Sequence, residues 1–420
     1  MAGKRGVIPR LPTADDLIDH IERQLREECG EAIVSLYRLP AGDDARRLRV
    51  RLHPAAREVE FTTGEPARVS VAATTADVGP GYHTYLAELV RRIGAEQSVT
   101  WEAPSEELGT ADDTGYFDSG RREDAERRLL VWLRGGLDQA NAARRIGGSA
   151  VAIQSTNGHR FVSDGRLITA LGPRDDAWLD AALGDPRVAI DVFPWWTDAL
   201  DARHLLNRAL TLMWTEVRWR PAATDDERLV QAESLRLLRR AYALDPSLPY
   251  PWREWQELMA HTGTIDPMSD RIAREAASSP DTPRIGYRRR PVMVTHAGWG
   301  LTVPGTFAER RSDGEWWGGE GGRAITLAAT PTETDGRPML PATFLQRVAG
   351  HLGTDVLRHE DGPIVGAARL TVNDEAGVET AVLEGYSAVV GSGAAIRVEI
   401  HDPADWEWAL DMWRSLRPAA

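Results

Sequence analysis

The chain has 420 residues, a formal net charge of −13, 42% hydrophobic residues and 27% charged residues. This length exceeds one ordinary hydrophobic core, so several domains are expected, and the composition is that of a globular protein. The acidic charge disfavours nucleic acid and anionic membranes as partners, and a single cysteine, Cys29, excludes an internal disulfide or a four-cysteine zinc site. Without an apolar run typical of a signal or a transmembrane helix, the sequence predicts a cytoplasmic protein.

The N-terminal part of the chain combines helices with antiparallel hairpins. Four strand-like runs occur between residues 32 and 74, and the turns Ala-Gly-Asp-Asp and Thr-Gly-Glu-Pro separate two pairs of them at the spacing of antiparallel hairpins. Thr13 is placed to cap the first helix. A glycine pair, Gly135 and Gly136, is expected to kink or break the helix predicted at residues 119–143. Apolar residues at helical spacing predict three helices here: residues 13–28, 82–93 and 119–143.

The middle of the chain is predicted to be mixed and then helical. Short strands and a helix are expected between residues 148 and 222, followed by helices between 225 and 260. Residues 262–290 are rich in Pro, Ser and Thr and predict a short helix with a linker. The remaining residues alternate strands with turns and end in a helix that Asp402 would cap. The apolar face predicted for that helix consists of Trp406, Leu410, Trp413 and Leu416.

These patterns predict an α+β fold with antiparallel sheets flanked by helices, in several domains with a helical middle segment. The expected divisions are an N-terminal α/β domain at 1–147, a second α/β segment at 148–222, a helical connector at 223–262, a linker at 263–290 and a C-terminal α/β domain at 291–420.

Two stretches of the sequence resemble each other. The strand-like runs at 68–74 and 324–330 each precede a loop with Gly and Pro, and then a helix-like stretch that stops at Gly94 or Gly353. This similarity predicts that one strand–loop–helix unit is used twice, with residues 30–101 as a partial or diverged copy of the C-terminal unit. The alternative is that short apolar strands look alike by chance. On the first interpretation, architecture alone explains the loop that carries His83.

The C-terminal segment resembles the Mog/PsbP-like fold. The likeness rests on the order of "GWGLTVPGTFAERR", "GEWWGGEGGRAITLAA", a helix, a strand meander and the final "DWEWALDMWRSLRP". The resemblance implies a central antiparallel sheet with helices on its faces. It also implies binding of proteins or small ligands without catalysis.

A second resemblance is local. "LLRRAYALDPSLPYPWREWQELM", residues 237–259, is similar to a single tetratricopeptide hairpin, with small residues where two helices would approach and Pro246 to stop the first. One such unit does not form a solenoid, so the resemblance implies a helical connector.

Two histidines are candidates for general-base chemistry, His83 with Asp77 and His159 with Asp164. Such a histidine needs a carboxylate that orients its imidazole, and the sequence leaves open whether either pair meets. The glycine-rich run at 316–323 precedes a strand and not the helix that a phosphate-binding loop requires. No cofactor or metal is therefore expected.

Tryptophan is abundant, with 15 residues, and it is enriched at interaction hot spots. Adjacent strand residues point to opposite faces, so one of Trp316 and Trp317 is expected in a core and the other partly open. The candidate partner-binding residues are Trp316, Trp317, Trp252 and Trp255. The favoured function is a non-catalytic adaptor or chaperone-like protein that binds a protein or peptide, and the net charge favours a basic or apolar ligand. The alternative is an enzyme with an unrecognised site that uses a histidine base. The oligomeric state is left open.

Overall fold

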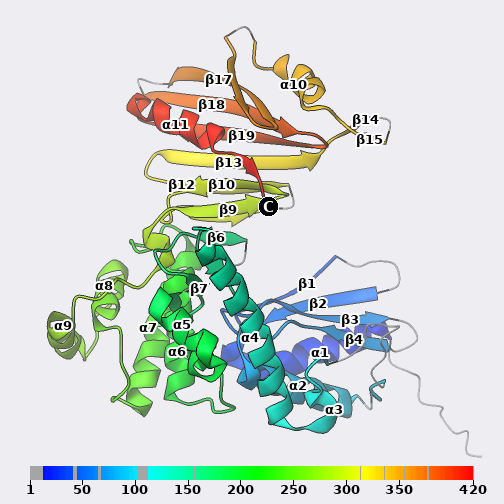
Figure 1. Ribbon diagram of the computed structural model, residues 1–420, viewed down its shortest axis with the longest axis vertical. Coiled ribbons are helices and arrows are strands. Elements are labelled where there is room, and N and C mark those ends of the chain that lie inside the picture. Colours follow the sequence, from blue (N-terminus) through cyan, green and yellow to red (C-terminus); the bar gives the residue numbers. More distant parts are fainter. Residues whose placement is uncertain are drawn as a thin grey trace, which may run out of the picture. The chain divides into compact units, whose positions relative to one another are not determined.

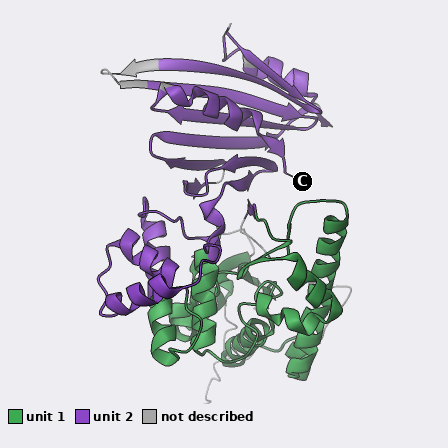
Figure 2. Ribbon diagram, turned by 60° about the vertical axis from the view of Figure 1, so that its left-hand side comes forward, with its two compact units in different colours: residues 1–155, 163–213, 236–250 green, residues 156–162, 214–235, 251–420 purple. Residues whose placement is uncertain are grey.

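The structure is a computed structural model, and its segments form two compact units that alternate along the chain (Figure 2). Unit 1 comprises Met1–Ser155, Ser163–Met213 and Arg236–Tyr250, and unit 2 comprises Thr156–Val162, Trp214–Leu235 and Pro251–Ala420. Helices and antiparallel sheets occur in both, so the predicted α+β multi-domain fold is confirmed. The residues that the structure describes are 13–40, 45–64, 68–97, 99–102, 112–154, 158–312, 314–334, 336–353, 355–375 and 378–419.

Unit 1 begins with a four-stranded antiparallel meander and two helices (Figure 1). Their bounds are α1 (Ala14–Cys29), β1 (Ser35–Arg38), β2 (Ala45–Arg51), β3 (Val59–Gly64), β4 (Arg68–Ala72) and α2 (Pro80–Glu96). Thr13 caps α1 in a capping box with Asp16, as a Thr at this position favours. Ile21 of α1, Phe61 of β3 and Leu89 of α2 belong to one buried cluster, so the helices and hairpins predicted here are confirmed.

The long helix of unit 1 corrects one prediction. It runs unbroken over α4 (Arg122–Arg145), although Gly135 and Gly136 lie near its middle. Gly136 faces Ile153, which would lie 2.9 Å from a Cβ, so close packing explains this glycine better than a kink does. The remaining elements of unit 1 are α3 (Tyr116–Ser119), β5 (Val151–Ala152), β7 (Leu167–Thr169), β8 (Gly172–Arg174), α5 (Asp176–Gly184), η2 (Pro186–Val192) and most of α6 (Ala202–Thr215).

The predicted helical middle is present as α7 (Asp225–Leu244), α8 (Trp252–Thr262) and α9 (Ser269–Ser278). Helix α7 ends before Pro246, as the proline predicts. Its first residues belong to unit 2 and its last to unit 1. The tetratricopeptide resemblance of this region stays an expectation.

Unit 2 contains two large antiparallel sheets and a two-stranded one. Of the two large sheets, the smaller has the order β20-β10-β9-β6 and the larger the order β11-β12-β13-β19-β18-β17-β16 (Figure 1). The strands of the smaller sheet are β6 (His159–Phe161), β9 (Val292–His296), β10 (Trp299–Val303) and β20 (Arg417–Pro418). Those of the larger are β11 (Ala308–Arg311), β12 (Glu315–Glu320), β13 (Arg323–Pro331), β16 (Leu357–Asp361), β17 (Ile364–Glu375), β18 (Val378–Val389) and β19 (Ser392–Ile400). Part of the turn predicted between β17 and β18 lies outside the described residues.

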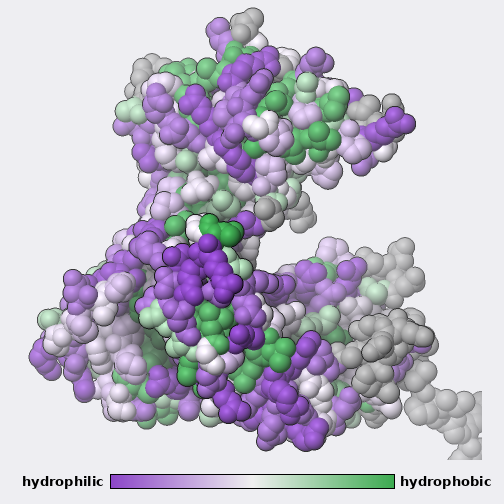
Figure 3. Space-filling view, viewed as in Figure 1, coloured by the Kyte–Doolittle hydropathy of each residue, from purple (hydrophilic) through white to green (hydrophobic). Residues whose placement is uncertain are grey.

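The two faces of the seven-stranded sheet are covered unequally. Helix α11 (Trp406–Arg414) lies across β18 and β19 (Figure 1), and its Trp413 sits so close to Gly385 that a Cβ there would approach the ring to 2.6 Å. Figure 3 shows hydrophilic and hydrophobic side chains interspersed over this side of unit 2. On the opposite face, α10 (Pro341–Ala349) places Phe344 over Gly393 and packs mainly on β17, β18 and β19. The part of that face on β11, β12 and β13 therefore has no helix over it among the described elements.

The final helix also differs from the prediction. It starts at Trp406, after a 3₁₀ turn η4 (Pro403–Asp405), and Asp402 accepts a hydrogen bond from the Ala404 N–H of that turn at 2.9 Å. The later start turns Trp406 away from the apolar face, and 42% of its surface is exposed, whereas Leu410 and Trp413 are buried.

The two similar stretches both form a strand, a loop and a helix, but in different surroundings. Strand β4 is the edge of its sheet, whereas β13 lies between β12 and β19. A small hairpin of β14 (Glu333–Thr334) and β15 (Arg337–Pro338) separates β13 from α10. Internal duplication stays a prediction.

Candidate functional site

The face of the seven-stranded sheet opposite α11 carries a continuous cross-strand row of large polar and aromatic side chains, which begins on β11, β12 and β13 and continues onto the strands that α10 contacts. The register pairs each member with the next, and directly paired residues on one face of a sheet are neighbours. Strands lie about 4.8 Å apart, so the row spans roughly 24 Å. In strand order from β11 to β17 it consists of Arg310, Trp317, Thr326, Arg397, Glu384 and Arg369.

Charge is unevenly compensated along this row. Arg397 lies 2.8 Å from Glu399 and 3.7 Å from Glu384, so its charge is shared locally. Arg310 stacks over the Trp317 ring, with its guanidinium carbon 5.5 Å from the ring centre. Among the described residues, neither Arg310 nor Arg369 has a carboxylate within ion-pair distance. The row therefore has an unneutralised cation near each end and an aromatic ring next to one of them.

The predicted split between the two adjacent tryptophans is present. Trp316 is fully buried in the core of unit 2, and Trp317 is partly exposed on the other face. The second predicted pair behaves alike, since Trp255 is fully buried and stacks on the partly exposed Trp252 at 5.4 Å. Because Trp316 and Trp255 have no exposed surface, they cannot contact a partner, and only Trp317 and Trp252 remain candidates.

His159 belongs to a buried ion network within unit 2. Its Nε2 lies 2.9 Å from Glu309 Oε2, and the Glu309 carboxylate also accepts from Arg288 at 2.9 Å and Trp316 Nε1 at 3.1 Å. The two contacts make opposite demands on Nε2, because Glu309 can only accept from it and Arg288 Nη2, 3.0 Å away, can only donate to it. The partner predicted for His159, Asp164, lies exposed in the turn after β6. Sequence reasoning missed Glu309, which is 150 residues away.

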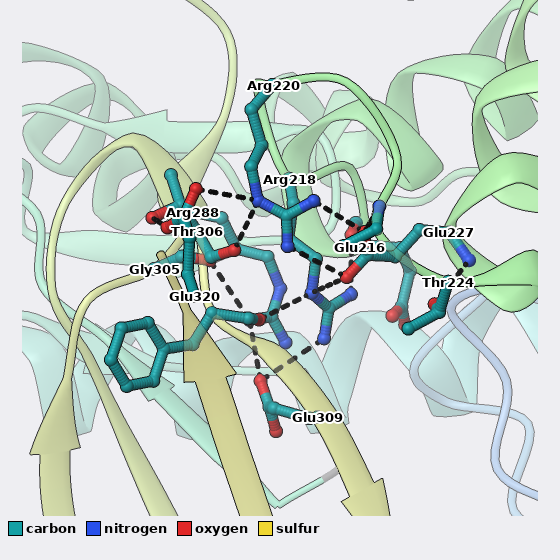
Figure 4. Close-up of polar contacts among 12 residues, drawn as sticks. Glu216, Arg218, Arg220, Thr224, Glu227, Arg288, Gly305, Thr306, Glu309 and Glu320 are labelled. Atoms are coloured by element: carbon teal, nitrogen blue, oxygen red, sulfur yellow. Dashed lines mark hydrogen bonds and ion pairs between the residues drawn. The ribbon is translucent and has the colours of Figure 1, made fainter. Parts of the chain in front are cut away.

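The network continues through two further arginines (Figure 4). Arg218 Nη2 lies 3.2 Å from Glu309, and Arg220 binds Glu227 at 2.7 Å and Glu320 at 3.0 Å. Burial alone would raise the pKa of Glu309, but the hydrogen bond from His159 and the charges of Arg288 and Arg218 hold it below its usual value. The guanidinium groups also donate to backbone carbonyls at Thr215, Gly305, Thr306 and Phe307. The network joins the 214–227 segment to the sheets of unit 2 and has its charges matched, which fits a structural role.

His83 lies in the first turn of α2 and is held on both sides of its ring. Thr75 Oγ1 is 2.9 Å from Nδ1, and on the other side Nε2 lies 2.8 Å from Thr114 Oγ1 and 3.3 Å from Asp112 Oδ2. The carboxylate predicted for it, Asp77, lies 3.3 Å from Arg57 instead. The side chains of His83 and Asp112 are 11% and 13% exposed, so the group lies just below the surface.

Asp112 is held rigidly. Its carboxylate accepts from the backbone N–H groups of Thr114 at 2.9 Å and Phe117 at 2.7 Å, besides the Thr114 hydroxyl. Burial would raise the pKa of Asp112, but the His83 and backbone hydrogen bonds lower it overall, so it is ionised at neutral pH. Sequence reasoning did not pair Asp112 with His83, because 29 residues separate them along the chain.

A third histidine group is fully buried in unit 1 around Trp195. The rings of His53 and His204 lie 6.1 Å apart, and His204 lies 4.2 Å from Trp195. Arg208, also buried, donates to the carbonyls of residues 31 and 32. Burial, reinforced by the Arg208 charge, lowers the pKa of His204 to about 4 and that of His53 well below its usual value.

Within the described residues, no group of three or more His, Cys, Asp or Glu side chains is placed to hold a metal ion. A search of the same residues for a helix of sufficient length and hydrophobicity to span a bilayer finds none.

Comparison with known proteins adds little. No family model matches the chain, and no curated protein matches it. A protein of Bacteroides thetaiotaomicron VPI-5482, known from a crystal structure at 1.50 Å resolution, is similar over 30% of this chain with 9% identity and a TM-score of 0.25. The match covers 46% of that protein's chain, less than half its length, and a likeness this low carries no argument.

Proposed function

We propose that unit 2 of the protein acts as a non-catalytic adaptor that binds an extended segment of a protein partner across the sheet face opposite α11. The observation that carries this proposal is the row from Arg310 to Arg369, with the half-open Trp317 beside Arg310. Tryptophan and arginine are the residues most enriched at interaction hot spots. An extended peptide rises about 3.3 Å per residue, so roughly seven residues would cross the row.

The charge of the row selects the partner. Arg310 and Arg369 favour carboxylates at the two ends of the bound segment, and Trp317 favours an apolar or aromatic side chain near one end. This differs from the basic or apolar ligand that the net charge favours, because a contact a few ångströms long responds to local and not to summed charge. We also propose a cytoplasmic location, which the single cysteine supports since disulfides belong to oxidising compartments.

The proposal is tested with short synthetic peptides that carry aspartate or glutamate at both ends and a leucine or phenylalanine between, titrated against the full chain by fluorescence anisotropy. We expect binding that weakens with salt, and a loss of about tenfold or more in Trp317→Ala. Trp406→Ala is the matched control, because Trp406 is also exposed but lies on α11 over the opposite face. Equal affinities of the two variants, or no binding of any such peptide, would show that the face is not a binding site.

A further inference from the structure

The contacts around His83 place a proton on its Nε2. Asp112 is an anion and can only accept, so the single hydroxyl proton of Thr114 points to it at 2.8 Å. The Thr114 oxygen is then left to accept, and His83 Nε2 donates to it at 2.8 Å. A neutral imidazole with its proton on Nε2 has a bare Nδ1, to which the Thr75 hydroxyl donates at 2.9 Å.

This order of hydrogen bonds is that of an activated nucleophile. A hydroxyl bonded to an imidazole that a third group orients is the recognisable geometry of covalent acyl transfer, whatever the fold. We infer that Thr75 is a nucleophile with His83 as its general base, and that Thr114 and Asp112 are positioning residues for His83. This inference concerns unit 1 and does not depend on the sheet face of unit 2.

The reaction class is transfer of an acyl group from an ester. Thr75 Oγ1 attacks the carbonyl carbon as its proton passes to His83 Nδ1, and His83 returns that proton to the leaving alcohol when the ester C–O bond breaks. A water molecule then gives a proton to the same nitrogen and attacks the acyl-threonine. The bond between the acyl carbon and Oγ1 breaks, and Thr75 recovers its proton.

The surroundings restrict the substrate. Asp112 places negative charge beside the relay, which repels phosphate esters and other anions, whereas Arg128 balances the neighbouring Asp113 at 3.4 Å. Thr75 follows the exposed run Ala72–Thr74, and both Thr75 and His83 of α2 are partly exposed. The substrate expected is therefore a neutral or cationic ester that approaches over this loop.

The experiment uses p-nitrophenyl acetate with the full chain. We expect release of nitrophenolate together with acetylation of Thr75, mapped by mass spectrometry. Lys4 is the only lysine in the sequence, so amine acetylation is confined to the chain start and does not obscure the result. Thr75→Val, which removes only the hydroxyl, abolishes the adduct. Thr62→Ala on β3, another partly exposed threonine of unit 1, leaves it unchanged.

The role of His83 is separated from a structural one by rescue. His83→Ala slows acetylation by about 100-fold, and added imidazole restores part of the rate, which it could not do if His83 only held the turn in place. The wild-type rate is measured over a series of pH values, and Asp112→Asn changes the shape of that profile because the anion beside the relay is removed. Absence of an adduct on Thr75 in the folded wild type, or an undiminished rate in Thr75→Val, would overturn the assignment.

Discussion

Arg288 has 1% of its side chain exposed, yet it carries a full charge that Glu309 balances at 2.9 Å. Burial of an ion is costly unless it is paired and hydrogen-bonded, and here the guanidinium also donates to the carbonyls of Thr215 and Gly305. Removal of one member of such a pair lowers the free energy of unfolding by more than the intact pair contributes to it, because the other charge is left buried and uncompensated.

Arg288→Met is therefore expected to lower the free energy of unfolding by about 3–5 kcal/mol, because Glu309 stays buried with less compensation. Urea unfolding followed by circular dichroism measures the change. Arg358→Met on the exposed edge strand β16 is the control and should stay within about 0.5 kcal/mol of the wild type. Equal effects of the two variants would mean that the network does not stabilise unit 2.

Single residues were predictable only in part from the sequence. Both candidate histidines do meet a carboxylate, but not the one nearest in the chain. His83 meets Asp112 and His159 meets Glu309, partners that the fold brings together from 29 and 150 residues away. Sequence spacing predicts neighbours within a helix or hairpin, whereas contacts between elements depend on topology.

At the scale of elements, the alternation of β12 decides what its two tryptophans do. Trp316 lies in the unit 2 core and donates to Glu309, whereas Trp317 stands on the uncovered face. Periodicity was enough to predict this split, as it was to predict α1 and the hairpins, because burial of one face follows directly from a repeat of two or 3.6 residues.

Trp316→Ala is expected to lower the free energy of unfolding by about 3–5 kcal/mol through the cavity and the lost hydrogen bond. Trp317→Ala should change it by less than about 1 kcal/mol. Thermal unfolding of both variants in parallel measures the difference. The opposite order would place Trp317 in the core and Trp316 outside.

The two glycines of α4 give another paired comparison. The glycine pair predicted a kink because glycine has a low helix propensity. Tertiary packing of Leu129, Leu133 and Leu137 nevertheless stabilises the continuous helix. A Cβ on Gly135 meets nothing within 4 Å, whereas one on Gly136 lies 2.9 Å from Ile153.

Gly135→Ala should raise the free energy of unfolding by about 0.5–1 kcal/mol, the gain in helix propensity. Gly136→Ala should lose that gain, since Ile153 must shift. Denaturant midpoints at constant slope report both changes. A loss of stability in Gly135→Ala would contradict the open space beside it.

At the scale of the whole molecule, two buried histidines make stability depend on pH. His53 and His204 have folded pKa values below the usual 6.5, because of burial and then the Arg208 charge. Arg51 adds to the effect on His53, and Asp201 partly opposes it on His204. The unfolded chain thus binds more protons below pH 6.5. The stability that the two neutral histidines contribute is complete above pH 6.5 and is lost as the pH falls toward 4.

Between pH 6.5 and 5, before the carboxylates of the ion network begin to titrate, the free energy of unfolding should fall by up to about 1.4 kcal/mol per pH unit for each histidine. His204→Phe keeps a ring against Trp195 and should reduce this slope by up to one proton. Urea titrations at a series of pH values measure it. An unchanged slope in this variant would mean that His204 does not titrate on unfolding.

Strand β6 belongs to unit 2 although unit 1 segments precede and follow it along the chain. His159 of β6 contacts Arg288, which is synthesised 129 residues later. Strand β9, which pairs with β6 in the sheet, follows Arg288 directly. At about 5–20 residues per second, a ribosome needs roughly 6 to 26 seconds to supply them. For that time the nascent strand has an open edge and an uncovered Phe161. Slower synthesis lengthens the interval in proportion, so the yield of folded protein should depend on the speed of translation through the helical middle.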